Sequence, residues 1–108
     1  MNPGAMTGAE GRQVEELITL EISVTTVDAQ KSLVTVFKAG QAKEIAEEHE
    51  RASRRAYSRE LIPAPNVIIA IGLNSIAKIL HLQSLYGYHN ARARLNRVTA
   101  NREAHYGH

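Results

Sequence analysis

The chain of 108 residues contains no cysteine. Disulfide bonds, thiolate metal ligands and a cysteine nucleophile are therefore excluded, and the absence fits a reducing compartment. The first eleven residues have neither the basic region nor the apolar core of a secretory signal peptide. From these absences we predict a cytoplasmic location.

Long hydrophobic runs are also missing. The longest, Val67–Leu73, has Gly72 inside it and is followed by Asn74, Ser75 and Lys78. A helix that spans a membrane needs about 20 mostly apolar residues. The sequence therefore predicts no membrane partner.

Signatures of catalysis are missing as well. The chain has no G-x-S-x-G nucleophile turn, no phosphate-binding glycine loop and no dinucleotide fingerprint. General acid–base work needs a carboxyl group in a desolvated cleft, and nothing in the sequence creates one. We predict a non-enzymatic protein with no catalytic residue, cofactor or small-molecule substrate. An enzyme would need a pocket between subunits lined by His49, Tyr57 and His81.

Metal ligands on a helix lie three or four residues apart. No two of the five histidines have this spacing within a predicted helix, so we predict no metal site. The five are His49, His81, His89, His105 and His108.

Length and composition describe one small globular domain. Apolar residues make up 44% and charged residues 22% of the chain, close to the average for globular proteins, and 108 residues suffice for one core. Residues 1–13 are rich in glycine and lack periodicity, which predicts a flexible tail. Residues 14–108 are expected to form a single α+β domain.

Two segments in the first half of the chain have the pattern of β-strands. Residues Leu17–Thr26 alternate between apolar and polar side chains, and Ser32–Lys38 is rich in β-branched residues. The polar segment Asp28–Lys31 between them is turn-like. The sequence predicts an N-terminal antiparallel β-hairpin that ends at Gly40.

Residues Gln41–Glu60 have the clearest helical pattern. Glu47 and Arg51 lie four residues apart, as favourable ion pairs do on a helix. The same spacing separates Glu50 from Arg54. The apolar face expected to be buried consists of Ala42, Ile45, Ala46, His49, Ala52, Ala56 and Tyr57.

The most apolar stretch, Asn66–Tyr86, lies between a proline-containing break at residues 61–65 and Gly87. One interpretation is a single helix, because the apolar spacing continues across Gly72. The other is a strand over Val67–Ile71 followed by a helix, since four of its five residues are β-branched. We favour the long helix. Either structure predicts burial of Ile76, Ile79, Leu80, Leu82 and Leu85.

A basic helix is expected at the C-terminus, after a break at residues 86–88. It would run from Ala91 to about Glu103, with Ala91, Leu95 and Val98 facing inward. The expected architecture is thus a hairpin followed by two or three helices.

The C-terminal part of the chain carries most of the excess positive charge. Residues 61–108 contain five basic residues against Glu103 alone. Arginine binds carboxylates and phosphates, and tyrosine stacks on bases. The predicted contacts with an acidic protein surface or a nucleic acid are Arg92, Arg94, Arg97, Arg102, Tyr86 and Tyr88.

Large aliphatic residues exceed what a small monomer readily buries, which predicts a homo-oligomer. Its interface is expected at Ile69, Leu73, Ile76 and Leu80. We therefore predict a small oligomeric adaptor protein that acts through protein–protein contacts. The alternative is a nucleic-acid-binding accessory protein that uses the arginine-rich helix.

Overall fold

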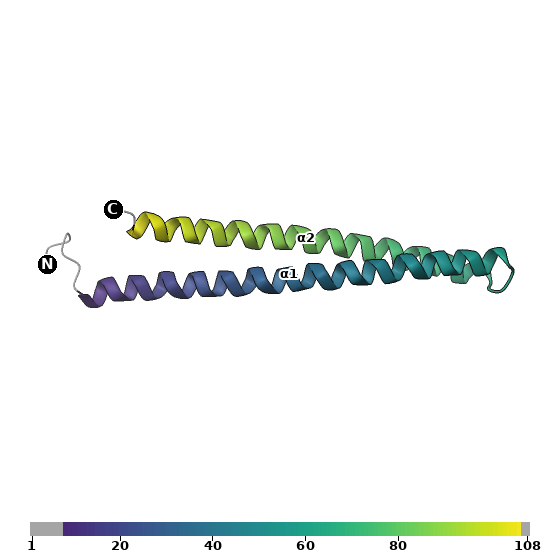
Figure 1. The fold of residues 1–108 in the computed structure, drawn as a ribbon, viewed down its shortest axis with the longest axis horizontal. Helices are drawn as coiled ribbons and strands as arrows, with labels where there is room; N and C mark the ends of the chain where they lie inside the picture. Colours follow the sequence, from purple (N-terminus) through teal and green to yellow (C-terminus); the bar gives the residue numbers. More distant parts are fainter. Residues whose placement is uncertain (1–7, 107–108) are drawn as a thin grey trace. The chain divides into compact units, whose positions relative to one another are not determined.

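The computed structural model describes residues 8–106, and within them it contains two long helices (Figure 1). Helix α1 comprises the 51 residues Gly8–Ser58, and helix α2 the 43 residues Ala64–Tyr106. No strand occurs in this described part of the chain. The predicted α+β fold with an N-terminal hairpin is therefore wrong, and the fold is all-α.

The first predicted strand, Leu17–Thr26, is helical because its sequence also satisfies a helical spacing. Ile18 and Ile22 lie four residues apart and are both partly buried on one side of α1. The hydroxyl of Thr25 donates a hydrogen bond to the Glu21 carbonyl at 2.8 Å, so this β-branched polar residue is satisfied within the helix. Strand propensity depends strongly on context, and here the helical contacts prevail.

The second predicted strand, Ser32–Lys38, and the expected end of the sheet at Gly40 also lie inside α1. The segment Asp28–Lys31 between the two predicted strands contains no glycine or proline, and Asp28 is its one turn-favouring residue. The chain continues as one helix through this segment.

Helix α1 ends in a Schellman motif, in which the last turn is closed by two reversed backbone hydrogen bonds. The Leu61 amide donates to the Ala56 carbonyl, and the Glu60 amide donates to the Tyr57 carbonyl, both at 2.9 Å. Glu60 adopts a left-handed conformation with φ of 60°. A break was predicted at residues 61–65, and the observed break lies at residues 59–63. Pro65 lies in the first turn of α2, where its missing amide hydrogen costs nothing.

Replacing Glu60 by glycine should stabilise the protein by roughly 1 kcal/mol, because a residue with a Cβ atom is strained in the left-handed region. Chemical denaturation monitored by circular dichroism measures this change. Glu60→Ala is the control, since it removes the same charge but keeps the Cβ atom. Equal stabilities of the two variants would contradict the assigned backbone conformation.

Helix α2 contains the whole apolar stretch Asn66–Tyr86, which confirms the preferred interpretation as one helix. The predicted break at residues 86–88 is wrong, because α2 continues through Gly87. A Cβ atom added at Gly72 or Gly87 would meet nothing within 4 Å. Neither glycine has a positive φ, so both adopt ordinary helical conformations.

The chain divides into two compact units. The first combines residues 1–31 with 89–108, of which 8–31 and 89–106 are described, and the second consists of residues 32–88. Each unit contains a segment of α1 that pairs with a segment of α2. Residues 1–7 of the predicted tail lie outside the described part, and α1 already begins at Gly8.

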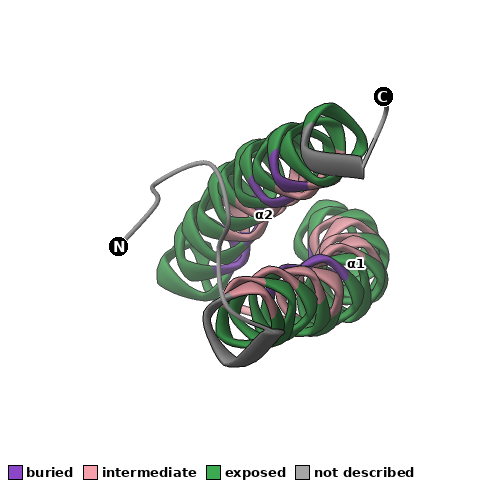
Figure 2. Cartoon of the chain, turned by 90° about the vertical axis from the view of Figure 1, so that its left-hand side faces the viewer, coloured by how far each residue is buried: buried purple, intermediate pink, exposed green. Residues whose placement is uncertain are grey.

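Buried and partly buried positions form one stripe along each helix, and most positions outside these stripes are exposed (Figure 2). In the 32–88 unit these inner stripes recur every three or four residues, which is the spacing of helices that pair along a seam. Most of their side chains are small or polar. The inner stripe of α1 consists of Ser32, Val36, Ala39, Lys43, Ala46, Glu50 and Ser53. The inner stripe of α2 consists of Val67, Ala70, Asn74, Ala77, His81 and Ser84.

Candidate interaction surfaces

The inner stripes bring α1 and α2 close together in the 32–88 unit. Ala70 is completely buried, and Ser53 and Val67 are each 8% exposed. A Cβ atom added at Gly40 would lie 3.5 Å from Nε2 of His81, at ordinary contact distance. Small side chains at the seam therefore set the separation of the two helices, and their burial removes little apolar surface from water.

A polar contact crosses this seam between Asn74 and Glu50. Asn74 is 4% exposed, and its Nδ2 donates to Oε1 of Glu50 at 3.4 Å. The other carboxylate oxygen of Glu50 accepts a bond from Nε of Arg54, also at 3.4 Å. The Oδ1 atom of Asn74 is buried without a hydrogen-bond partner. A buried asparagine of this kind typically fixes the alignment of paired helices at a cost in stability.

Large apolar side chains lie outside the seam. The predicted interface residues Ile69, Leu73, Ile76 and Leu80, which we call the outer stripe, share one face of α2 and are each at least half exposed. Fully burying one such side chain contributes roughly 1.5–3 kcal/mol. The prediction that Ile76, Ile79, Leu80 and Leu82 are buried is wrong within this chain, because these four are exposed and only Leu85 is partly buried.

The buried face of α1 in the 32–88 unit also differs from the predicted one. Ile45 is 70% exposed, and Tyr57 and His49 are exposed as well. Of the predicted face only Ala46 and Ala56 are partly buried, while Lys43 and Glu50 lie on the buried side. The helix is therefore rotated so that small and polar side chains face α2, and larger apolar ones face outward.

The unit of residues 1–31 and 89–108 has a second exposed apolar stripe. Leu17, Leu20, Val24 and Val27 are exposed on α1 at intervals of three and four residues. Between Gln13 and Gln30 the only charged residues are acidic, namely Glu15, Glu16, Glu21 and Asp28. This stripe is therefore apolar with acidic surroundings.

The four predicted arginines lie on the α2 segment of the same unit, and all are exposed. Nη1 of Arg94 lies 4.0 Å from Oδ2 of Asp28 on α1, and Arg92 and Arg102 also interact within the protein. Ala91 and Val98 are buried and Leu95 is partly buried, which confirms the predicted inward face. The structure thus places the arginines on the outside of this segment.

The two predicted tyrosines belong to the other unit, residues 32–88. Tyr86 is 72% exposed, whereas Tyr88 is partly buried and interacts within the protein. Of the two, Tyr86 therefore has the more accessible ring for stacking.

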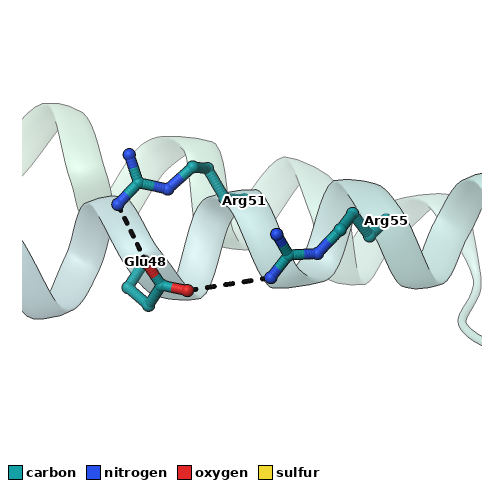
Figure 3. Close-up of polar contacts among 3 residues, drawn as sticks. All are labelled: Glu48, Arg51 and Arg55. Carbon is teal, nitrogen blue, oxygen red and sulfur yellow. Dashed lines mark hydrogen bonds and ion pairs between the residues drawn. The ribbon is translucent and has the colours of Figure 1, made fainter.

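A charged cluster lies on the exposed side of α1 (Figure 3). Oε2 of Glu48 accepts a bond from Nη2 of Arg51 at 2.9 Å, and Oε1 lies 3.7 Å from Nη2 of Arg55. The predicted pair of Glu50 with Arg54 is present. Arg51, however, pairs with Glu48 rather than with Glu47, whose nearest basic partner is Lys43 at 3.9 Å.

The hydrogen bond and the positive charge of Arg51 hold the pKa of Glu48 below its ordinary value, and Arg55 adds to this effect. A lowered folded-state pKa means that the interaction stabilises the protein above the ordinary carboxyl pKa. Its contribution is lost as the pH falls through the lowered value. Because these groups are exposed, salt screens the interaction.

Carboxyl NMR titration should therefore show Glu48 titrating at lower pH than an ordinary glutamate. In Arg51→Gln the midpoint should move back toward the ordinary value, because the largest cause of the shift is removed. Arg59→Gln is the matched control, since it removes the same charge far from Glu48. A midpoint that does not respond to Arg51→Gln would contradict the cluster.

Within one chain, His49, Tyr57 and His81 lie at different places, and a pocket between subunits is not tested by this structure. His49 lines a shallow cavity of about 290 Å³ with Ser53, Ile62, Asn66 and Ile69. Tyr57 lines a different depression at the end of α1, and His81 lies against Gly40. In the described part of the chain, no group of three or more His, Asp or Glu side chains is placed to hold a metal ion.

Helix α2 is also long and apolar enough, over residues Ala64–Ala104, to cross a membrane by length and composition. It is the one such helix among residues 8–106, and most of its apolar window is exposed. The core helix of a soluble protein meets the same two criteria. The lack of a long unbroken apolar run in the sequence therefore does not exclude a membrane-spanning helix in this chain.

No known protein family, curated protein or solved structure matches the sequence or the fold. The surfaces described above are consequently the basis for assigning a function.

Proposed function

We propose that the protein is a non-enzymatic binding protein of the cytoplasm that self-associates and acts through protein–protein contacts. The observation that supports this proposal is the distribution of side chains. Small and polar residues occupy the seam between α1 and α2, while large apolar residues such as Leu73 and Ile76 are exposed. Exposed apolar surface of this extent is typical of interaction sites.

The arginine-rich segment of α2 would supply the second contact of this adaptor. Arg92, Arg94, Arg97 and Arg102 are exposed, and residues 61–108 contain only one acidic residue. Arginine pairs well with carboxylates in a planar, two-pronged geometry. We propose that this segment binds an acidic protein surface.

Nucleic-acid binding is the second candidate, and the same exposed arginines support it. Binding to phosphates would weaken steeply with salt, because each neutralised phosphate releases counterions. The contact of Arg94 with Asp28 would oppose binding of either partner. The exposed large apolar residues favour a protein partner, because a phosphate backbone would not cover them, and protein binding is therefore our first choice.

Light scattering at low and high salt, with absorbance read at 260 and 280 nm, separates these functions. Self-association predicts a mass of two or more chains at both salt concentrations, with no nucleic acid. A monomer would contradict the proposal. Excess absorbance at 260 nm that high salt removes would favour the nucleic-acid alternative. Protein that leaves the membrane fraction only with detergent would contradict the cytoplasmic location.

Replacing Leu73 by aspartate should weaken self-association on the order of 100-fold, because a charge in an apolar interface loses its hydration. Leu82→Asp is the matched control. Leu73 and Leu82 are 50% and 58% exposed, but nine residues of helix place them on nearly opposite faces of α2. Sedimentation equilibrium measures both variants. Equal effects would show that the outer stripe has no special role.

A further inference from the structure

We infer that the outer stripe of α2 binds a second copy of this chain, with the two α2 helices antiparallel about a twofold axis. This inference rests on the self-association proposed above and specifies its geometry. Four features of the described residues support it: the spacing of the stripe, its lack of charge, the character of the other exposed stripes, and the exposure of its side chains.

The spacing of the outer stripe is self-complementary. Its members, Ile69, Leu73, Ile76 and Leu80, follow one another at intervals of four, three and four residues. This order reads the same in both directions along the helix. With a twofold axis between Leu73 and Ile76, each Leu73 therefore faces Ile76 of the second copy. In the same arrangement each Ile69 faces Leu80 of the second copy, so every stripe residue has an apolar partner.

Pairing along this face buries no charged side chain. Lys78 is the single charged residue between Leu61 and Ala91. It lies two residues from both Ile76 and Leu80, and two residues correspond to about 200° of helical rotation. Lys78 therefore projects away from the stripe and stays hydrated in the paired state.

The other exposed apolar stripes are less suited to self-pairing. On α1, the stripe of Leu17, Leu20, Val24 and Val27 is flanked by charged residues, because Glu21 and Asp28 lie beside it and Lys31 follows Val27 on the same face. On α2, the neighbouring stripe that begins at Ile68 has Gly72 and Ser75 in its middle. The outer stripe alone, among these three, is both uninterrupted and uncharged.

The outer stripe also presents exposed apolar side chains that a second chain could cover. All four side chains of the outer stripe are half or more exposed. The exposed apolar residue Leu82 lies on the opposite face of α2 and does not belong to this surface. A typical monomer has a largest apolar patch of roughly 300–600 Å², and a stable interface buries about 800 Å² on each partner. Pairing along the outer stripe would cover these four side chains, which are exposed in the 32–88 unit.

Disulfide cross-linking tests this geometry directly, because the chain has no cysteine of its own. Ile69→Cys and Leu80→Cys chains are mixed, oxidised and analysed by mass spectrometry. Antiparallel pairing predicts that position 69 of one chain bonds to position 80 of the other, since a disulfide requires Cα atoms about 4.4–6.8 Å apart. Parallel pairing instead predicts 69–69 and 80–80 bonds and would overturn the inference. Leu82→Cys, on the far side of α2, should not cross-link.

The mass in solution separates failure of this inference from failure of the proposed function. A dimer by light scattering without the 69–80 bond would refute the antiparallel outer-stripe pairing and leave self-association in place. A monomer would refute both. Circular dichroism of each cysteine variant confirms that it is folded. Leu73→Asp gives an independent check, because an undiminished dimer in that variant would also overturn the inference.

Discussion

Replacing Asn74 by aspartate is expected to lower the free energy of unfolding by roughly 3 kcal/mol at neutral pH, because it leaves an uncompensated charge in the helix seam. The side chain is nearly the same size, so packing changes little. Its new carboxylate would stand where Asn74 Nδ2 now lies, 3.4 Å from Oε1 of Glu50. A favourable contact thereby becomes a repulsion between two carboxylates.

The loss should depend on pH in a defined direction. Two carboxylates that share a site raise the pKa of one of them. A folded-state pKa above the unfolded value means that the penalty is present at high pH and disappears as the pH falls through the raised pKa. Asn74→Asp should therefore approach wild-type stability in mild acid.

Urea denaturation at several pH values measures this effect, with Ser75→Asp as the control. Ser75 is the next residue but is exposed, so its aspartate stays hydrated and should change stability by less than about 0.5 kcal/mol. Similar losses in the two variants would contradict the burial of Asn74 against Glu50.

Replacing Ala70 by leucine should lower the free energy of unfolding by about 1–3 kcal/mol, although the change adds apolar surface. Ala70 is completely buried, and the added atoms would push α1 and α2 apart at the seam. The loss should extend to neighbouring contacts, such as that between Asn74 and Glu50.

Ala52→Leu is the matched control for Ala70→Leu, because Ala52 is exposed on α1 of the same unit. It should leave stability almost unchanged. Thermal denaturation at one fixed protein concentration compares the two variants. A stabilising effect of Ala70→Leu would show that the seam contains unfilled space, which contradicts its close packing.

Several elements of the fold are predictable from local sequence. The break at residues 59–63 follows from the prolines, and the helix over Asn66–Tyr86 follows from an apolar spacing that continues across Gly72. The inward positions Ala91 and Val98 were also predictable, because Arg92, Arg94 and Arg97 between them favour water. In each case a local feature favoured the observed structure, although a strand over Val67–Ile71 was the alternative for the apolar stretch.

The first half of the chain could not be assigned by the same reasoning. Residues 17–26 satisfy a period of two and a helical period together, and their β-branched residues favour a strand when considered alone. The decisive feature is long-range: α1 pairs with α2, as Asp28 with Arg94 and Glu50 with Asn74 illustrate. Pairing between residues so far apart in the sequence leaves no local signal.

The burial pattern reversed the usual expectation that the largest apolar residues lie inside. Large size made Ile45, Ile76 and Leu80 look like core residues, yet all three are exposed in the chain. Small and polar residues recur at the seam with a seven-residue repeat, and this repeat was the signal that could have located the buried face of each helix. The choice of Ile69, Leu73, Ile76 and Leu80 as an interface is compatible with their exposure and remains a prediction.

The central claim is that the outer stripe is exposed in one chain and covered when two chains associate. The rate of thiol labelling of Leu73→Cys, measured from nanomolar to high micromolar protein, tests both parts of this claim. We predict fast labelling at low concentration and strong protection at high concentration, while Ser75→Cys stays fast throughout. A rate at position 73 that is the same at all concentrations, or equal protection at position 75, would contradict the account.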